Sequence, residues 1–488
     1  MSDRLAIAMV HYHLRRGGVT RVIQNALAAL DSDTVEAVVL TGEAPPDDST
    51  FSAPVQVVTG LAYDEGQTLP DPEALRRQVE DAARAALGRD PDIWHIHNHT
   101  LGKNAAWTAA VAGMSAAGHA LVLQIHDFAE DGRPANYRYL IDQLGDNDSL
   151  SEQMYPQAGR THYVLLNQRD EKILCSAGID ADRVHRLPNA VWTGDESAVA
   201  ASETSRAGPP LILYPTRAIR RKNIGEFLLW SAMEADTERR YGVTLAPESP
   251  GEKPIYAKWK TFAASLRLPI EFELGLKQSF PDLIQSAERL VTTSIAEGFG
   301  LAFLEPWLMG RPLAGRKLPE ITGEFEAAGV SLDGLYEQLT VPADWIDQDA
   351  ARAALDRAMT SAWQAYGGEV APPMIEQAWS SIERNGRVEF SRLDEAQQEK
   401  VIQHVHDSTS ARAEVTPNDV TALPIDEQQL RANQDVIRRT FGLDSYRERL
   451  MNIYAMVNGS ASDETGPILS DGVLNQFLSP ERFYLLRS

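Results

Sequence analysis

Two glutamates, Glu297 and Glu305, stand eight positions apart in the segment 294–313, SIAEGFGLAFLEPWLMGRPL. Gly298 and Gly300 between them let the backbone approach a ligand, and N–H groups at the start of the helix predicted next would face an anion. One carboxylate precedes that helix and the other lies on it, so together they could hold a polyol such as a sugar or a ribose. Two unrelated surface glutamates would give the same spacing, and this segment alone leaves that alternative open.

A run of cations follows a predicted strand in the second half of the chain, in the segment LYPTRAIRRKNIGEFLLW. Arg217 lies just past the strand, and Lys222 lies five residues later at a helix start. A departing diphosphate needs fixed cations of this kind, because negative charge grows on it as the sugar bond breaks. With Arg220 and Arg221, the run is unusual in so acidic a chain, although a solvated basic turn is the alternative.

A glycine pair, Gly17 and Gly18, stands between the first predicted strand and the first predicted helix, in HYHLRRGGVTRVI. Such a pair allows a tight turn whose backbone N–H groups meet a phosphate. A plain tight turn is the alternative. The pair lacks the G-x-G-x-x-G spacing of a dinucleotide site, which argues against a nicotinamide-dependent dehydrogenase.

Histidines gather at the ends of two predicted strands. Alternation along PDIWHIHNHT puts His95, His97 and His99 on one face of a strand and its exit loop. Three histidines could bind a metal, but no cysteine or carboxylate cluster accompanies them, so we predict no metal site. We expect His97 to bind a sugar hydroxyl and the other two to be structural. In LVLQIHDF, His126 and Asp127 are predicted to bind the acceptor, with a helix cap as the alternative for Asp127.

Composition and charge exclude several classes of function. A chain of 488 residues with 43% hydrophobic residues exceeds one ordinary core, so two domains are expected. No apolar run approaches the ~20 residues of a membrane span, and the run in MSDRLAIAMV is too short for a secretory signal, so we expect a cytoplasmic protein without stable membrane insertion. The single cysteine, Cys175, fits a reducing compartment. A net charge of −23 disfavours nucleic acid as a partner.

Short apolar runs alternate with amphipathic stretches, which predicts two doubly wound α/β domains of mostly parallel strands facing across a cleft. The strands predicted in the first half are Leu5–His11, Val35–Thr41, Val55–Val58, Ile93–His97, Ala120–His126, Tyr163–Leu166 and Val184–Leu187. Those predicted in the second half are Leu211–Tyr214, Val243–Ala246, Ile270–Leu274 and Arg289–Thr293. Long helices such as 349–366 and 444–457 dominate beyond about residue 333.

The expected domain boundaries follow from these runs. An N-terminal Rossmann-like domain covers 1–190, and a turn-rich linker covers 191–209. A second Rossmann-like domain, with a helical extension, covers 210–440. A crossover helix and a tail, 441–488, are expected to pack back on the N-terminal domain.

Taken together, these segments resemble the retaining glycosyltransferases of the GT-B fold, specifically glycosyltransferase family 4. The resemblance covers roughly residues 5–330. Its landmarks, in chain order, are Gly17–Val19, His95–His97, His126–Asp127, LPNAV at 187–191, Arg217 with Lys222, Glu297 with Glu305, and GRKLPEIT at 315–322.

The resemblance implies that the N-terminal domain binds the acceptor, with His126 and Asp127, and that the C-terminal domain binds the nucleotide sugar. Several of the other landmarks have an implied role in the donor site. Gly17 and Gly18 lie at the donor, with Gly18 beside its phosphates, and Arg217 and Lys222 neutralise the diphosphate. His97 touches the donor sugar. Glu297 binds a hydroxyl of the transferred hexose, and Glu305 binds the ribose. The loop between them offers backbone amides and consists of Gly298, Phe299, Gly300 and Leu301. The loop VTLAPESPGEKP departs from the glycine-rich pattern of the family, which leaves the base preference open.

The expected function is therefore a retaining hexosyltransferase that works by front-face substitution and needs no metal or other cofactor. Its donor would be a UDP- or GDP-hexose and its acceptor a small, soluble hydroxyl compound; the oligomeric state stays open. Two alternatives remain at this point: a phosphorylase of the same fold that uses inorganic phosphate, and a non-catalytic protein that binds sugar nucleotides.

Overall fold

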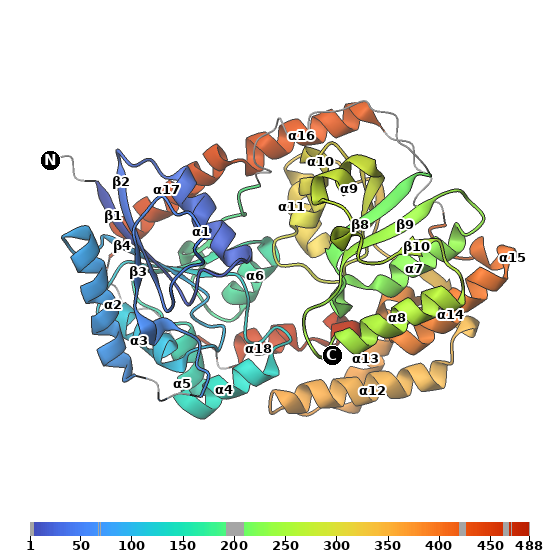
Figure 1. Cartoon of the computed structure of the whole chain (residues 1–488). Coiled ribbons are helices and arrows are strands. Elements are labelled where there is room, and N and C mark those ends of the chain that lie inside the picture. Colours follow the sequence, from blue (N-terminus) through green and yellow to red (C-terminus); the bar gives the residue numbers. More distant parts are fainter. Residues whose placement is uncertain are drawn as a thin grey trace. The chain divides into compact units, whose positions relative to one another are not determined.

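The computed structural model describes residues 4–66, 68, 70–191, 209–418, 426–461, 468–469 and 471–487 (Figure 1). The chain divides into two compact units: Met1–Ala190 with Arg439–Leu478, and Val191–Arg438 with Ser479–Ser488. The expected linker, 191–209, lies outside the described residues except at its two ends. The tail differs from the expectation, because its last ten residues belong to the second unit.

The first unit is built on a seven-stranded parallel sheet in the order β3-β2-β1-β4-β5-β6-β7. Its strands are β1 (Leu5–His11), β2 (Val35–Thr41), β3 (Val55–Val57), β4 (Ile93–His97), β5 (Leu121–Ile125), β6 (Thr161–Leu165) and β7 (Val184–Arg186). Strands β1, β4, β5 and β6 are buried along almost their whole length, as expected of a parallel sheet covered on both faces. The strand order reverses direction between β1 and β4, which is the topological switch point of this fold.

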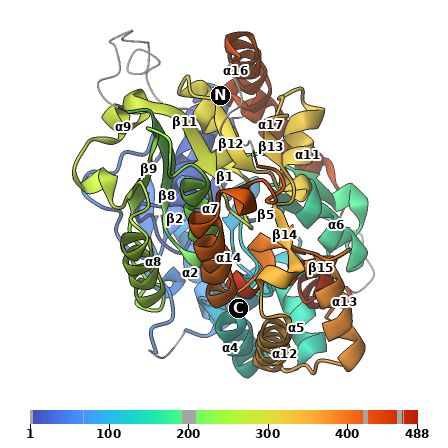
Figure 2. The same cartoon turned by 90° about the vertical axis from the view of Figure 1, so that its right-hand side faces the viewer.

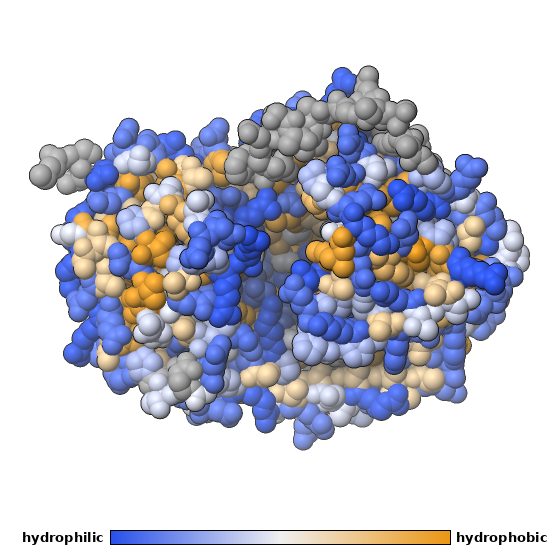
Figure 3. All heavy atoms as spheres, viewed as in Figure 1, coloured by the Kyte–Doolittle hydropathy of each residue, from blue (hydrophilic) through white to orange (hydrophobic). Residues whose placement is uncertain are grey.

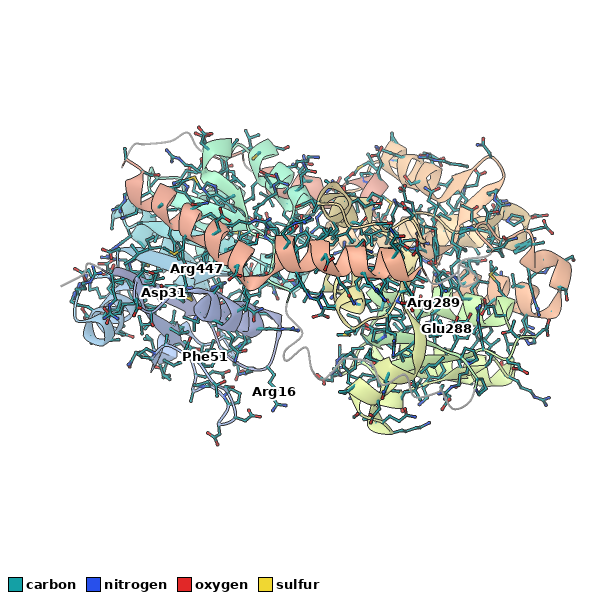
Figure 4. All side chains as sticks on the ribbon, turned by 90° about the horizontal axis from the view of Figure 1, so that it is seen from above. Arg16, Asp31, Phe51, Glu288, Arg289 and Arg447 are labelled. Carbon is teal, nitrogen blue, oxygen red and sulfur yellow. The ribbon has the colours of Figure 1, made fainter. Side chains whose placement is uncertain are left out.

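Helices cover both faces of this sheet. They are α1 (Gly18–Ala29), α2 (Pro72–Leu87), α3 (Ala105–Ala116), α4 (Pro134–Leu144), α5 (Asn147–Met154), α6 (Gln168–Ser176), α17 (Leu443–Gly459) and α18 (Gly472–Phe477). Asp71 and Asn104 cap α2 and α3 by accepting backbone N–H groups of the first turn. Tyr446 and Leu450 of α17 belong to the same buried cluster as strand β1, so this late helix completes the first core. Figure 4 shows Arg447 of α17 beside Asp31, an ion pair of 3.6 Å.

The second unit repeats the same topology with six parallel strands in the order β10-β9-β8-β11-β12-β13. These strands are β8 (Leu211–Arg217), β9 (Arg240–Leu245), β10 (Ile270–Glu271), β11 (Ala287–Thr292), β12 (Leu313–Arg316) and β13 (Leu335–Tyr336). The switch point here lies between β8 and β11. The predicted strand Ile270–Leu274 is shorter than expected, because Glu273 takes a left-handed conformation with φ of 62° and ends the pairing.

The helices of the second unit include the extension predicted beyond residue 333. They are α7 (Ile224–Met233), α8 (Lys253–Ser265), α9 (Phe280–Ser286), α10 (Glu305–Leu308), α11 (Pro319–Ala327), α12 (Gln348–Ala365), α13 (Pro372–Ile382), α14 (Glu395–Asp407), α15 (Thr409–Arg412) and α16 (Glu427–Phe441), and the unit boundary falls within α16. Figure 2 shows α14 beside α7, against which it packs. A small antiparallel sheet that the sequence did not predict joins β14 (Thr340–Pro342), β16 (Arg387–Glu389) and β15 (Glu383–Arg384).

Charged and polar side chains cover most of the face shown in Figure 3, with small apolar patches between them. Within the described residues, no helix is both long enough and apolar enough to cross a bilayer.

A buried ion cluster ties the extension to the second sheet. Arg316 at the end of β12 donates to both oxygens of Glu226 on α7, at 3.0 and 2.7 Å, and to Glu389 of β16 at 2.7 Å. The hydroxyl of Tyr336 donates to Glu226 at 2.6 Å. Burial raises the pKa of Glu226, and Arg316 opposes that rise. The guanidinium therefore holds together three elements that are distant in the sequence.

We expect Arg316→Met to lower the free energy of unfolding by about 3–5 kcal/mol, because it leaves two buried carboxylates without their cation. Lys277→Met is the matched control. Its ion pair with Glu271 spans 3.7 Å on side chains that are 61% and 42% exposed, and such pairs contribute at most about 1 kcal/mol. Urea unfolding followed by circular dichroism measures both, and equal losses in the two variants would contradict the structural role of Arg316.

Candidate functional site

The chemistry of the second unit concentrates at its switch point, where β8 and β11 end side by side. The loop after β8 leads into a short 3₁₀ turn, η4 (Arg220–Lys222), and the loop after β11 holds residues 293–300. Open parallel sheets bind ligands at this place, because the chain departs in opposite directions from the two strands and leaves a crevice. The predicted cations and Glu297 therefore lie on neighbouring loops.

Two cations share one carboxylate at this point. The ammonium of Lys222 donates to Oε1 of Glu297, and a guanidinium nitrogen of Arg221 lies 3.6 Å from Oε2. The side chains of Lys222 and Glu297 are only 13% and 11% exposed. Arg221 also donates to the carbonyl of Ala296 at 2.7 Å. The cluster has one more positive than negative charge, which suits it to an anionic ligand.

The burial of this cluster shifts the titration of both partners. Burial lowers the pKa of Lys222, and the nearby Arg221 adds to the effect, while Glu297 opposes it. For Glu297, burial acts to raise the pKa, but the charges of Lys222 and Arg221 outweigh burial and lower it. Glu297 thus stays ionised and helps Lys222 to keep its proton.

Backbone carbonyls of the turn are anchored to the ends of the strands. Thr293 donates its hydroxyl to the carbonyls of Lys222 and Asn223, at 2.9 and 3.0 Å, and Tyr214 donates to that of Lys222 at 3.1 Å. Asn223 has a φ of 50°, a left-handed conformation that asparagine tolerates better than most residues. These contacts fix the turn, so that Lys222 is held in place before any ligand binds.

Arg217, the last residue of β8, contacts the loop after β9. It donates to the carbonyl of Ala246 at 3.1 Å and pairs with Glu248 at 2.8 Å. This loop is part of the segment VTLAPESPGEKP, where the resemblance to the family predicted a glycine-rich loop. Arg217 and Lys222 thus flank the switch point on different sides.

Arg220 has supporting partners that sequence reasoning missed. Its side chain forms a two-pronged ion pair with Glu395 of α14, at 2.7 and 3.1 Å, and donates to the carbonyl of Leu485 at 3.1 Å. Its backbone N–H donates to Glu252 at 2.7 Å. Leu485 and Leu486 are buried, so the end of the tail docks beside the turn that presents Lys222. No local sequence signal marks these partners, because they lie up to 265 residues away.

The Gly-Phe-Gly loop has a structure different from the expected one. In place of one apolar helix, the chain forms a 3₁₀ turn, η6 (Leu301–Phe303), followed by the four-residue helix α10. Pro306 in the first turn of α10 explains the break, because proline is favoured at a helix start and disrupts a helix interior. Gly300 has a φ of 97°, and a Cβ there would lie 2.9 Å from Ile321, so glycine is required.

One pocket brings two predicted donor residues together. It has a volume of about 110 Å³ and is lined by Lys222 and Glu305, with Tyr214, Thr216 and Phe280 among its other residues. Glu305 begins α10, while Lys222 ends η4, so two elements that are distant in the sequence contribute to one lining. A nucleoside diphosphate could place its phosphates near Lys222 and its ribose near Glu305.

In the first unit, Gly17 stands at the N-cap of α1 and Gly18 is its first residue. Both glycines are exposed, and no side chain caps the helix. Arg16 extends outward from the same loop, as Figure 4 shows, and pairs with Asp48. The exposed backbone of this turn is therefore open to an anion.

The histidines occupy the ends of β4 and β5 as predicted, but they bond mainly to one another and to the core. His97 and His126 share a hydrogen bond of 3.0 Å between Nδ1 and Nε2. His95 bonds to the hydroxyl of Tyr454 at 2.8 Å, and His99 bonds to the carbonyl of Met154 at 2.8 Å. His97 is completely buried, and its Nε2 has no hydrogen-bond partner among the described residues.

Asp127 is not a helix cap, so that alternative is wrong: Arg133 occupies the N-cap position of α4, and Asp127 accepts from its guanidinium instead. The side chain of Asp127 remains 42% exposed and could still accept from a ligand hydroxyl. His126 and Asp127 both donate their backbone N–H groups to Asn98, which fixes the loop after β5.

Burial keeps these imidazoles neutral. It lowers the pKa of His95 and of His99 to about 4 and that of His126 to about 3, and it holds the pKa of His97 well below the usual value. Neutral imidazoles at this edge can exchange hydrogen bonds with hydroxyls without adding charge. Within the described ranges, no three His, Cys, Asp or Glu side chains converge on a point that could hold a metal ion.

Comparisons with known proteins agree with this architecture. Residues 17–190 match the glycosyl transferase 4-like domain. Over 347 residues, the chain is 26% identical to mannosylglucosyl-3-phosphoglycerate synthase of Petrotoga mobilis, an alignment that covers 64% of this chain and 65% of that protein. The chain thus spans less than two thirds of the length of this curated relative.

Two solved structures have the same fold. A glycosyltransferase from Rickettsia africae superposes with a TM-score of 0.53 at 12% identity, over 94% of this chain and 100% of that one. Anabaena HepE, solved in complex with UDP-glucose, gives a TM-score of 0.51 at 14% identity, over 93% of this chain and 100% of that one. The chain has the GT-B fold, and its resemblance to the family-4 glycosyltransferases is confirmed.

The buried histidines predict a pH dependence of stability. In the unfolded chain each takes up a proton near pH 6.5, whereas His95, His99 and His126 resist protonation until about pH 3–4 in the fold. Because the unfolded state binds more protons, the free energy of unfolding should fall as the pH drops from 7.5 to 5.5, approaching about 1.4 kcal/mol per pH unit for each histidine below pH 6.5.

Urea unfolding at several pH values measures this slope. His95→Gln serves as the comparison, because it keeps a polar side chain and removes one imidazole. The variant should be less stable at pH 7.5 but lose less stability on acidification. Identical slopes in the two proteins would show that His95 does not resist protonation.

Proposed function

We propose that the protein is a glycosyltransferase that moves a hexose from a nucleotide sugar to the hydroxyl of a small acceptor, with retention of the anomeric configuration. The observation that carries this proposal is the Lys222–Glu297–Arg221 cluster at the switch point of the second sheet, with Glu305 in the same pocket as Lys222. The fold, the matched domain and the Petrotoga relative support it.

In this proposal the phosphates of the donor lie against Lys222 and Arg221. The ammonium of Lys222 has three N–H donors, so it can keep Glu297 and still bind a phosphate oxygen. The surplus positive charge stabilises the diphosphate as its bond to the sugar breaks. Glu297 holds a hydroxyl of the hexose and keeps Lys222 protonated.

The acceptor reacts from the same face of the sugar that the diphosphate leaves. Its oxygen forms the new bond to the anomeric carbon, the old carbon–oxygen bond breaks, and a departing phosphate oxygen takes the acceptor's proton. The two cations supply the charge that a metal would otherwise provide, so the proposed reaction is independent of metal. The sugar roles of His97 and Gly18 stay predictions.

The name of the Petrotoga relative describes the synthesis of mannosylglucosyl-3-phosphoglycerate, a small sugar derivative that bears a phosphate and a carboxylate. HepE was solved with UDP-glucose. We therefore propose a UDP- or GDP-hexose as donor and a small, soluble acceptor, such as a sugar acid or a sugar phosphate.

A panel of UDP- and GDP-hexoses, incubated with the protein without acceptor, tests the proposal through slow release of nucleoside diphosphate. One donor should be hydrolysed, and EDTA should leave the rate unchanged. Thermal shift with nucleoside diphosphates and with inorganic phosphate runs alongside. A response to phosphate and none to nucleotides would indicate a phosphorylase instead. Tight donor binding without hydrolysis or transfer to any acceptor would indicate a non-catalytic binding protein.

Lys222→Ala should reduce kcat/KM for the donor by roughly 30- to 1,000-fold, or about 2–4 kcal/mol of transition-state stabilisation, because the leaving diphosphate loses a fixed cation. Lys260→Ala is the control, since Lys260 pairs with Glu273 on a side chain that is 42% exposed and lies outside the pocket lining. Unchanged turnover in the Lys222 variant would disprove its role at the leaving group.

A further inference from the structure

A second group of polar side chains flanks the switch point of the first sheet and has no role in the function proposed so far. His13 follows β1, and Lys103 follows β4, the two strands between which the strand order reverses. Tyr63 joins them from the loop after the 3₁₀ turn η1 (Thr59–Leu61). We call these three residues the Lys103 site. It belongs to the first unit, whereas the donor pocket belongs to the second.

The three side chains meet at the ring of Tyr63. The Nζ atom of Lys103 lies 5.6 Å from the centre of that ring, and Nε2 of His13 lies 3.0 Å from its hydroxyl. The ring of Tyr12 packs edge-on against Tyr63 at 5.3 Å and holds it in place. An ammonium, a phenol hydroxyl and an imidazole therefore lie within one short stretch of the sheet edge.

The backbone beneath the site is firmly held. Asn104, which is fully buried, donates its amide to the carbonyls of Gly60 and Ala62, both at 2.8 Å. The N–H of Asp64 donates to the carbonyl of Lys103 at 2.7 Å, and Tyr139 donates to the carboxylate of Asp64 at 2.7 Å. The loops that present Tyr63 and Lys103 are thus cross-linked, and a ligand would not have to order them.

Lys103 differs from two arginines of the first unit in its lack of an ion pair with a carboxylate among the described residues. Arg15 forms a two-pronged pair with Glu43, and Arg133 pairs with Asp127. Lys103, in contrast, has no carboxylate within ion-pair distance among the described residues, although it is half-buried. It is one of only two lysines in the first 190 residues of a chain with net charge −23. Burial lowers the pKa of His13, with Arg15 adding to the effect, so His13 is neutral at pH 7 and can hydrogen-bond in either sense.

A half-buried ammonium without a counter-ion, beside a hydroxyl and a neutral imidazole, suits the acid group of a ligand, because each lysine–anion hydrogen bond is stronger than a neutral one. We propose that the acceptor carries a phosphate or a carboxylate and that Lys103, with Tyr63 and His13, binds this group. The inference rests on the proposed transferase function and specifies the acceptor: an acidic small molecule. Of the histidines at the ends of β4 and β5, the half-buried His126 would then be left to contact its hydroxyls.

The test is a binding measurement that requires no turnover. Isothermal titration of the whole protein uses four related compounds: 3-phosphoglycerate, glycerol 3-phosphate, glycerate and glycerol. They carry both acid groups, the phosphate alone, the carboxylate alone and neither, so the pattern identifies which group is bound. At least one acidic compound should bind and glycerol should not.

Lys103→Ala should weaken that binding by about 10- to 100-fold, the effect expected for one lost charged hydrogen bond. Lys103→Arg should restore part of it. The matched control is Lys172→Ala, which removes the other lysine of the first 190 residues, an exposed side chain on α6. Anions that bind equally well to wild type and to Lys103→Ala, or bind to neither, would overturn the proposal.

Donor hydrolysis without acceptor, assayed on the same variants, separates this proposal from the function on which it rests. If Lys103→Ala hydrolyses the donor like wild type but loses the acidic ligand, both proposals stand. If Lys103→Ala keeps both hydrolysis and anion binding, only the proposed Lys103 site is wrong. If wild type hydrolyses none of the donors, the proposed transferase function is wrong. Anion binding that is present in wild type and lost in Lys103→Ala would then indicate a site for an acidic ligand of another reaction.

Discussion

A surplus of positive charge, held in a largely buried turn, is the constraint around which the second unit is organised. Lys222 and Arg221 share the carboxylate of Glu297, and burial lowers the pKa of Lys222, an effect that this carboxylate opposes. Such an arrangement is stable only if the turn cannot relax into water. Thr293 and Tyr214 prevent this by binding the carbonyls of the turn, so the ends of β8 and β11 fix the charge that a phosphate would meet.

The acidic residues that give the chain its negative net charge also position several of its cations. Glu248 holds Arg217, and Glu252 and Glu395 hold Arg220 from its backbone and its side chain. The end of the tail adds the carbonyl of Leu485. The helical extension and the last residues of the chain therefore contribute to the site without touching the pocket, because they orient the turn that presents Lys222.

The two sheets share one strand order but carry different chemistry at their switch points. The first has neutral, buried imidazoles and a lysine that pairs with no carboxylate in the described part of the chain, whereas the second has paired cations and a pocket lined by Glu305. Neutral donors and acceptors suit hydroxyl groups, and fixed cations suit a leaving diphosphate. This difference supports the proposed division of work, in which the first unit binds the acceptor and the second the donor.

The sequence by itself determined the parallel α/β class, most of the strands and the residues at their ends, because buried strands are continuous apolar runs and the motif residues follow them directly. It could not give the short strands β12 and β13, the early end of β10, the break before α10 or the small antiparallel sheet, because these short segments have too few residues for a period. Only the tertiary structure decided that Arg217 pairs with Glu248 and that Arg220 contacts Glu395 and the tail. It also decided that Lys103 has no carboxylate within ion-pair distance among the residues that the structure describes. The physical reason is that an ion pair depends on the distance between two side chains and on their burial. A local sequence pattern encodes neither when the two residues lie more than a hundred positions apart, as Arg220 and Glu395 do.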